Sequence, residues 1–75
     1  MSEGQKLLMK YLVSINSPMD CTLLIVDMMW EERTIRKLFK YILENQDSDY
    51  LQLYEIAYKI ASEEGTLNYY PKEDD

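Results

Sequence analysis

The chain has 75 residues, of which 47% are hydrophobic and 29% are charged, and its formal net charge is −6. This length allows one domain with one small core, and the composition is too apolar for a wholly disordered protein. Because no apolar run reaches the roughly 18 residues of a transmembrane helix, and because the single cysteine excludes an internal disulfide, we expect a cytoplasmic protein.

The first predicted helix spans residues 3 to 15. Ser2 and Gln5 have the spacing of a capping box, in which each side chain bonds the backbone N–H of the other residue. The Asn16-Ser17-Pro18 stretch ends this helix. Between these signals, apolar residues recur at helical intervals: Leu7, Leu8, Tyr11, Leu12 and Ile15.

The second predicted helix is long and spans residues 18 to 45. Ser17 suits the N-cap, Pro18 suits the first helical position, and Asp20 complements the dipole of the first turn. No Gly or Pro follows within the segment, and Glu32 and Arg36 have the four-residue spacing of a favourable ion pair. At 1.5 Å per residue, this helix would be about 42 Å long.

The same segment has a second interpretation, because its apolar face narrows near the middle. Residues 19–30 are apolar on almost every side of a helical wheel, whereas from Ile35 onward cations occupy part of the circumference. A turn at residues 31–33 would make the segment a helix-turn-helix, with a recognition helix at about residues 34–45. The cations expected to face DNA in that case are Arg33, Arg36, Lys37 and Lys40.

The apolar half of this segment also predicts self-association. Two short neighbouring helices do not easily cover a helix that is apolar on all sides, and large uncovered patches usually mark interfaces. We expect a homodimer whose interface includes Val26, Met29 and Trp30.

The third predicted helix spans residues 49 to 64. Asp49 as N-cap places Gln52 at the capping-box position, and Gly65 suits a left-handed C-terminal cap. Residues 1–70 are therefore expected to form a single helical domain, and residues 71–75 an acidic, disordered tail. The predicted fold class is all-α: a small three-helix bundle with a long central helix, completed by dimerisation.

The residue types argue against catalysis and metal binding. The chain has no histidine, which removes the usual general base and the usual zinc ligand. Residues 45–49 begin like a calcium loop, but that loop needs Gly at its sixth position and Glu at its twelfth, where Tyr50 and Ile56 stand. We expect a non-enzymatic protein with no catalytic residue, no cofactor and no metal.

The distribution of charge indicates a class of function. Residues 1–45 have as many cations as anions, so the whole net charge of −6 lies in residues 46–75. Carboxylates beside tyrosines can occupy a groove built for phosphates, so we expect a regulator or inhibitor that binds a basic, nucleic-acid-handling protein. The expected contact residues are Glu55, Glu63, Glu64, Tyr54, Tyr58 and Tyr69.

The same charge distribution is compatible with two different roles. The acids could serve only as a solvated surface that keeps a small protein soluble. The helix-turn-helix alternative would make the protein a DNA-binding regulator, although the excess of negative charge weakens attraction to phosphates. Contact with a membrane is not expected.

Overall fold

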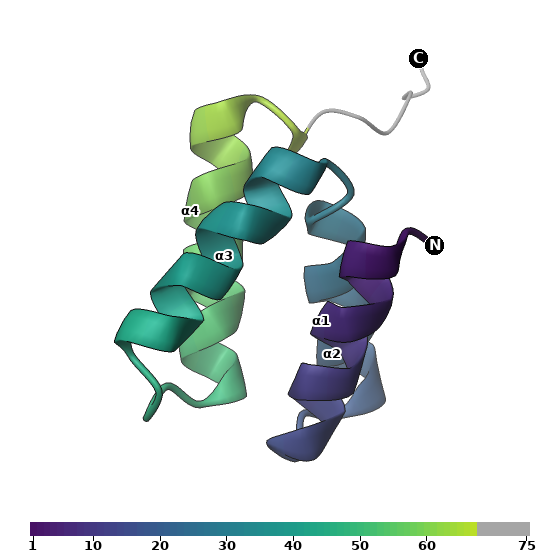
Figure 1. Cartoon of the computed structure of the whole chain (residues 1–75), viewed down its shortest axis with the longest axis vertical. Helices are drawn as coiled ribbons and strands as arrows, with labels where there is room; N and C mark the ends of the chain where they lie inside the picture. The colour runs from purple at the N-terminus through teal and green to yellow at the C-terminus, as the bar shows by residue number, and fades with distance from the viewer. Residues whose placement is uncertain (68–75) are drawn as a thin grey trace.

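The computed structural model describes residues 1–67, which form four α-helices and no strand (Figure 1). The predicted all-α fold class is confirmed, but the predicted count of three helices is wrong, because two helices replace the single one predicted over residues 18–45. Tyr69 and the tail predicted at residues 71–75 lie outside the described residues. The helices are α1 (Glu3–Ser14), α2 (Met19–Met28), α3 (Glu32–Glu44) and α4 (Tyr50–Glu64).

The capping box predicted at the start of α1 is confirmed. Ser2 Oγ accepts a hydrogen bond from the Gln5 N–H at 3.1 Å, and Gln5 Oε1 accepts one from the Ser2 N–H at 3.0 Å. The Gln5 side-chain amide also donates to the carbonyl of Val26 on α2, at 2.9 Å. Gln5 therefore caps α1 and also connects it to α2 through a hydrogen bond. Beyond the end of α1, Asn16 turns the chain with a left-handed φ of 67°.

The start of α2 differs by one residue from the prediction. Pro18 occupies the N-cap position instead of Ser17, and no side chain caps the first N–H groups. Ser17 Oγ lies 2.7 Å from the hydroxyl oxygen of Thr22, which is buried and also lies 2.9 Å from the Pro18 carbonyl oxygen. The hydroxyl of Thr22 thus satisfies its hydrogen bonding locally, as threonine often does one turn into a helix.

Tertiary packing, and not a helix-breaking residue, separates α2 from α3. Residues 29–31 contain no Gly or Pro, and Glu31 at the N-cap of α3 makes no side-chain capping bond. Met29 is completely buried, and Trp30 donates its indole N–H to the carbonyl of Thr66, just beyond α4, at 3.1 Å. Thr34 is buried and donates its hydroxyl to the Glu31 carbonyl at 2.6 Å. These contacts replace the helical hydrogen bonds that one continuous helix would have made.

The start and end of α4 agree with the prediction to within one residue. Asp49 accepts a hydrogen bond from the Gln52 N–H at 2.9 Å. Gly65 ends the helix with a φ of 76°, in the left-handed region where a Cβ is unfavourable. This turn brings Thr66 to the indole of Trp30.

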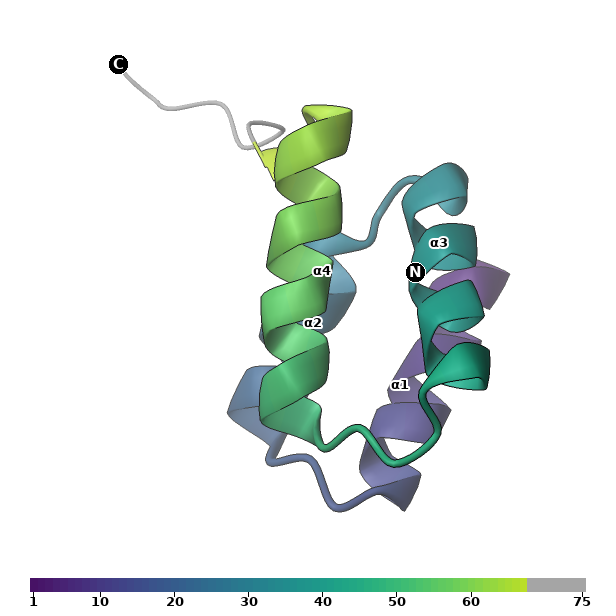
Figure 2. The same cartoon turned by 90° about the vertical axis from the view of Figure 1, so that its left-hand side faces the viewer.

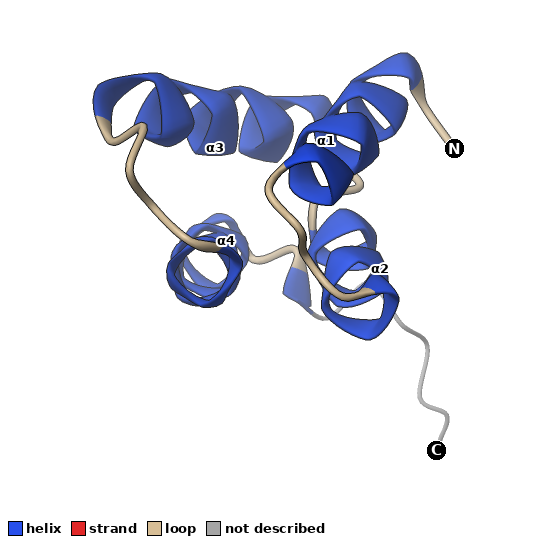
Figure 3. Cartoon of the chain, turned by 90° about the horizontal axis from the view of Figure 1, so that it is seen from below, coloured by secondary structure: helices blue, strands red, loops and turns tan. Residues whose placement is uncertain are grey.

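The four helices form two layers. Seen from below, α1 and α3 lie in one layer, and α2 and α4 lie in the other (Figure 3). α1 and α3 run in one direction while α2 and α4 run in the opposite one (Figure 2). Contacts between α1 and α2, and between α3 and α4, join the layers. The consecutive helices α2 and α3 therefore lie at opposite corners, and residues 29–31 carry the chain from one layer to the other.

The core lies between the layers and receives side chains from all four helices. At Gly4, α1 approaches α3 so closely that a Cβ would lie 3.0 Å from Ile35 Cδ1. These side chains form one core within a single chain. The largest fully buried apolar ones are Leu8, Leu12, Ile25, Val26, Met29, Leu38 and Leu53.

Candidate protein-binding surface

The two layers of the bundle carry opposite charge. α1 and α3 together contain six cations and three carboxylates, whereas α2 and α4 contain five carboxylates and one lysine. Along the sequence the charges of residues 1–45 cancel, but the fold sorts them, because α2 is placed beside α4 and away from α3. The molecule consequently has one acidic side and one basic side, which favours partners of complementary charge.

The outer surface of the acidic layer also exposes apolar side chains. Three positions of α2 and three of α4 recur at intervals of four and then three residues, which places each set on one side of its helix. All six side chains are exposed; Leu24, Leu51 and Tyr58 are 53%, 59% and 51% exposed. α2 and α4 are neighbours in this layer (Figure 3). We call this set the acidic face: Asp20, Leu24, Asp27, Leu51, Glu55 and Tyr58.

Two of the six predicted contact residues, Glu55 and Tyr58, belong to the acidic face. Tyr54 is half-buried and packs against the core. Glu63 is exposed but lines a groove between α3 and α4. Tyr69 lies outside the described residues. The structure thus brings together only part of the predicted set.

Glu64, the remaining residue of that set, joins α4 to α3. Its carboxylate accepts a hydrogen bond from Lys37 Nζ and pairs with Arg33 Nε at 3.2 Å, and its side chain is only 19% exposed. The hydrogen bond from Lys37 lowers the pKa of Glu64 below its ordinary value of 4.5; desolvation opposes this shift, and the charges of Lys37 and Arg33 reinforce it. Glu64 is therefore held against α3 and is not part of the acidic face.

Three of the four cations predicted to face DNA are paired within the chain. Arg33 and Lys37 bind Glu64, as described above. Arg36 Nη2 lies 3.2 Å from a carboxylate oxygen of Glu32, which confirms the predicted pair one turn apart. An intramolecular carboxylate competes with a phosphate for each of these cations, so the electrostatic attraction to DNA is reduced.

The fourth cation, Lys40, lies on the rim of the groove between α3 and α4. This groove has a volume of about 370 Å³, and two glutamates and two further lysines also line it: Glu44, Glu63, Lys37 and Lys59. In a helix-turn-helix, the two helices of the motif meet at a steep angle across the turn. Here α2 and α3 occupy opposite corners of the bundle (Figure 3). The packing of α2 and α3 therefore does not resemble that motif.

Two of the three residues predicted at a dimer interface belong to the core. The exposed fractions of Val26 and Met29 are 1% and 0%, so neither side chain is on the surface. Trp30 is 37% exposed, and its indole N–H bonds the Thr66 carbonyl. Val26 and Met29 are therefore not available to an interface between copies, whereas Trp30 is partly exposed.

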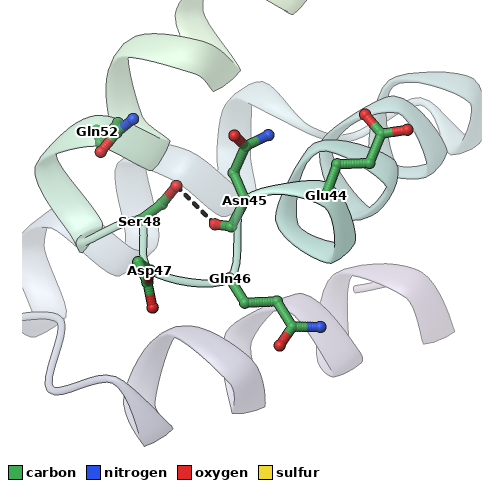
Figure 4. Close-up of a pocket in the computed structure, with 6 residues that line it drawn as sticks. All are labelled: Glu44, Asn45, Gln46, Asp47, Ser48 and Gln52. Atoms are coloured by element: carbon green, nitrogen blue, oxygen red, sulfur yellow. Dashed lines mark hydrogen bonds between the residues drawn. The ribbon is translucent and has the colours of Figure 1, made fainter.

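The loop between α3 and α4, considered above as a calcium loop, forms a polar hollow of about 290 Å³ lined by residues 44–48 and Gln52 (Figure 4). Ser48 donates its hydroxyl to the Asn45 carbonyl at 2.8 Å, and the Gln52 side chain donates to the Tyr41 hydroxyl at 3.0 Å. One of these bonds lies within the loop, and the other joins the end of α3 to the start of α4. Within residues 1–67, no group of three or more acidic or cysteine side chains is arranged to hold a metal ion.

The spacing of residues on α2 indicates part of the acidic face, although the total charge of the segment does not. Asp20, Leu24 and Asp27 share one side of α2, but the net charge of residues 1–45 is zero and hides them. Leu51 was likewise not expected, because its neighbour Leu53 continues the buried pattern of α4. Counting charge for each helix face, instead of along the chain, would have identified Asp20 and Asp27 as two acids on one side of α2, but their place beside α4 depends on the fold.

Comparison with known proteins provides no match from which a function could be transferred. No family model, no curated protein and no solved structure matches this chain. In the part of the chain that the structure describes, none of the helices has the length and apolar character to cross a membrane. The surface of the bundle is therefore the part of the molecule that indicates a function.

Proposed function

We propose that this protein is a non-enzymatic regulator or inhibitor that binds a basic protein through the acidic face. One observation carries the proposal: exposed leucine and tyrosine side chains stand among three carboxylates on two adjacent helices. Protein interfaces commonly place aromatic and apolar anchors inside a polar rim. A surface that served only solubility would not need three strongly exposed large apolar side chains on the same face.

The carboxylates and the apolar side chains would have different effects on binding. Asp20 and Glu55 would attract a basic partner over a distance and raise its association rate, with a strong dependence on salt. Leu24 and Tyr58 would be buried on contact and slow dissociation. A partner that handles nucleic acid suits this arrangement, because carboxylates can occupy sites made for phosphates.

We place this interaction in the cytoplasm. Cys21 is a free thiol on α2, and a lone thiol is compatible with a reducing compartment. Neither a cofactor nor a metal is needed for the proposed role, because binding alone would regulate the partner.

The experiment uses three tagged proteins: the wild type, a face variant and a matched control. The face variant carries Glu55→Gln and Tyr58→Ser, and the control carries Glu44→Gln and Leu43→Ser on α3, which also removes one carboxylate and one exposed apolar side chain. Each is used to capture proteins from the native host, followed by mass spectrometry. We expect a basic protein with the wild type and the control but not with the face variant. Equal capture by all three would contradict the proposal.

One observation supports DNA binding as a second candidate. The chain turns at residues 29–31, close to the turn at residues 31–33 that a helix-turn-helix requires. The pairing of Arg33, Arg36 and Lys37 and the separation of α2 from α3 weigh against it. We therefore rank DNA binding second.

A further inference from the structure

The outer side of α1 forms an exposed apolar surface with basic side chains. Leu7 and Val13 are 57% and 50% exposed. They line a shallow hollow of about 500 Å³, together with Met9, Glu3 and two lysines. We call the following residues the basic hollow: Lys6, Leu7, Lys10 and Val13.

The basic hollow faces away from the rest of the bundle. Lys6, Lys10 and Val13 are spaced by four and then three residues and are exposed, whereas Leu8 and Leu12 on the other side of α1 are fully buried. The three ion pairs formed among residues 1–67 involve neither lysine of the hollow. The charges of Lys6 and Lys10 therefore remain exposed to a partner that carries carboxylates.

The basic hollow and the acidic face are complementary in charge, and both carry exposed apolar side chains. In the hollow, two lysines one helical turn apart lie beside Leu7. On the acidic face, Asp20 lies one helical turn from Leu24, and Glu55 and Tyr58 stand on the neighbouring helix. We propose that the acidic face of one copy docks into the basic hollow of another, so that the protein associates with itself head to tail. The apolar side chains would meet at the centre and the opposite charges at the rim.

This contact would join two different surfaces, since the hollow is on α1 and the acidic face is on α2 and α4. A contact between different surfaces is heterologous: it either closes into a ring or continues as an open chain of copies. It thus differs from the symmetric dimer expected from the sequence. Contact across little more than one helix face belongs to the small, weak class of interfaces, so we expect association at high concentration.

The inference goes beyond the proposed function and does not depend on it. If both hold, another copy and the basic partner compete for the acidic face, and an excess of partner separates the copies. The net charge of −6 opposes association of copies at low ionic strength. At physiological salt the screening length is about 8 Å, so the complementary charges in contact outweigh the distant repulsion.

The first test is the molar mass of the wild-type chain by sedimentation equilibrium, from micromolar to millimolar concentration at physiological salt. We expect the average mass to rise from the monomer value of 9.0 kDa to more than twice that value. A mass that stays at the monomer value at millimolar concentration would overturn the proposal.

Two single substitutions then separate the two surfaces. Leu7→Glu places a carboxylate in the basic hollow, and Tyr58→Lys places a cation on the acidic face. Each variant alone should remain monomeric, because one of its two surfaces is lost. Mixed in equal amounts, they should form a complex of twice the monomer mass and no larger, because each still has the surface that the other lacks.

Leu43→Glu is the matched control, since Leu43 is 69% exposed on α3, outside both surfaces. This variant should associate as the wild type does. Circular dichroism checks that all three variants are folded. A symmetric contact would give a different pattern, in which only one of the two surface variants dissociates and mixing restores nothing; that pattern would refute head-to-tail docking.

Discussion

Replacing Met29 by alanine tests whether this side chain belongs to the core or to an interface. The substitution removes Cγ, Sδ and Cε from a site with 0% exposure. Losing the burial of these atoms costs about 2 kcal/mol, and the cavity left behind raises the cost to about 2–5 kcal/mol. The whole free energy of unfolding for a domain of this length is roughly 4–11 kcal/mol. The melting temperature should therefore fall by at least about 10 °C.

The assay is thermal and urea denaturation followed by circular dichroism, at two protein concentrations that differ a hundredfold. Because the core is formed within one chain, the loss in Met29→Ala should be the same at both concentrations. Leu43→Ala is the control: it shortens an exposed side chain of α3 outside both proposed surfaces, and it should cost less than about 1 kcal/mol. The burial of Met29 would be refuted by a loss as small as that of the control, or by one that grows on dilution, as for an interface residue.

Three further predictions concern the C-terminal end of the fold and its charges. Glu64→Gln should destabilise the protein at neutral pH; because the pKa of Glu64 is lowered in the fold, the difference from wild type should persist above the ordinary pKa of 4.5 and shrink as the pH falls below it, as measured by urea denaturation at several pH values. Gly65→Ala should lower stability by about 1 kcal/mol through backbone strain alone, since no atom lies within 4 Å of the added Cβ; an unchanged melting temperature would argue against the left-handed cap. Duplex DNA should bind no more tightly than micromolar at physiological salt, and sub-micromolar binding that Arg36→Ala abolishes would reverse the ranking of the two functions.

The sequence was most informative where local chemistry decides the structure. Ser2 with Gln5, and Asp49 with Gln52, are capping signals that act within one helical turn, and both N-cap side chains accept the expected backbone bond. The reciprocal bond of the capping box forms only at Ser2, because the Gln52 side chain bonds the Tyr41 hydroxyl instead. Gly65 likewise marks the end of α4, because the left-handed turn there needs a residue without a Cβ. These signals depend on residues close in sequence, so they could be recognised without knowing the fold.

The break between α2 and α3 could not be predicted in the same way. It lacks Gly, Pro and a side-chain cap, and it depends on the burial of Met29 and on the bond from Trp30 to Thr66, 36 residues away. The helix-turn-helix alternative did include a turn, but placed it at residues 31–33 and not at residues 29–31. The narrowing of the apolar face after residue 30 was the one feature of the sequence that indicated the break. It reflects the different packing of the two helices, because α2 lies in one layer and α3 in the other.

The candidate surface was predicted only in part for a related reason. Glu55 and Tyr58 were identified from the acidic composition of the last third of the chain. Asp20 and Leu24 join them only because α2 is placed beside α4, and that placement follows from the break. Glu64 was assigned to the surface because its two partners, Arg33 and Lys37, are far from it in sequence.

The hydrogen bond between Trp30 and Thr66 places a tryptophan where its fluorescence reports on the end of α4. Trp30 is the only tryptophan, so indole emission originates at one place, where the connection between α2 and α3 meets the end of α4. Loosening of α4 at that end would change the surroundings of the indole even while the helices remain formed. If fluorescence during denaturation changes before the circular dichroism signal does, the end of α4 detaches in a separate step ahead of global unfolding.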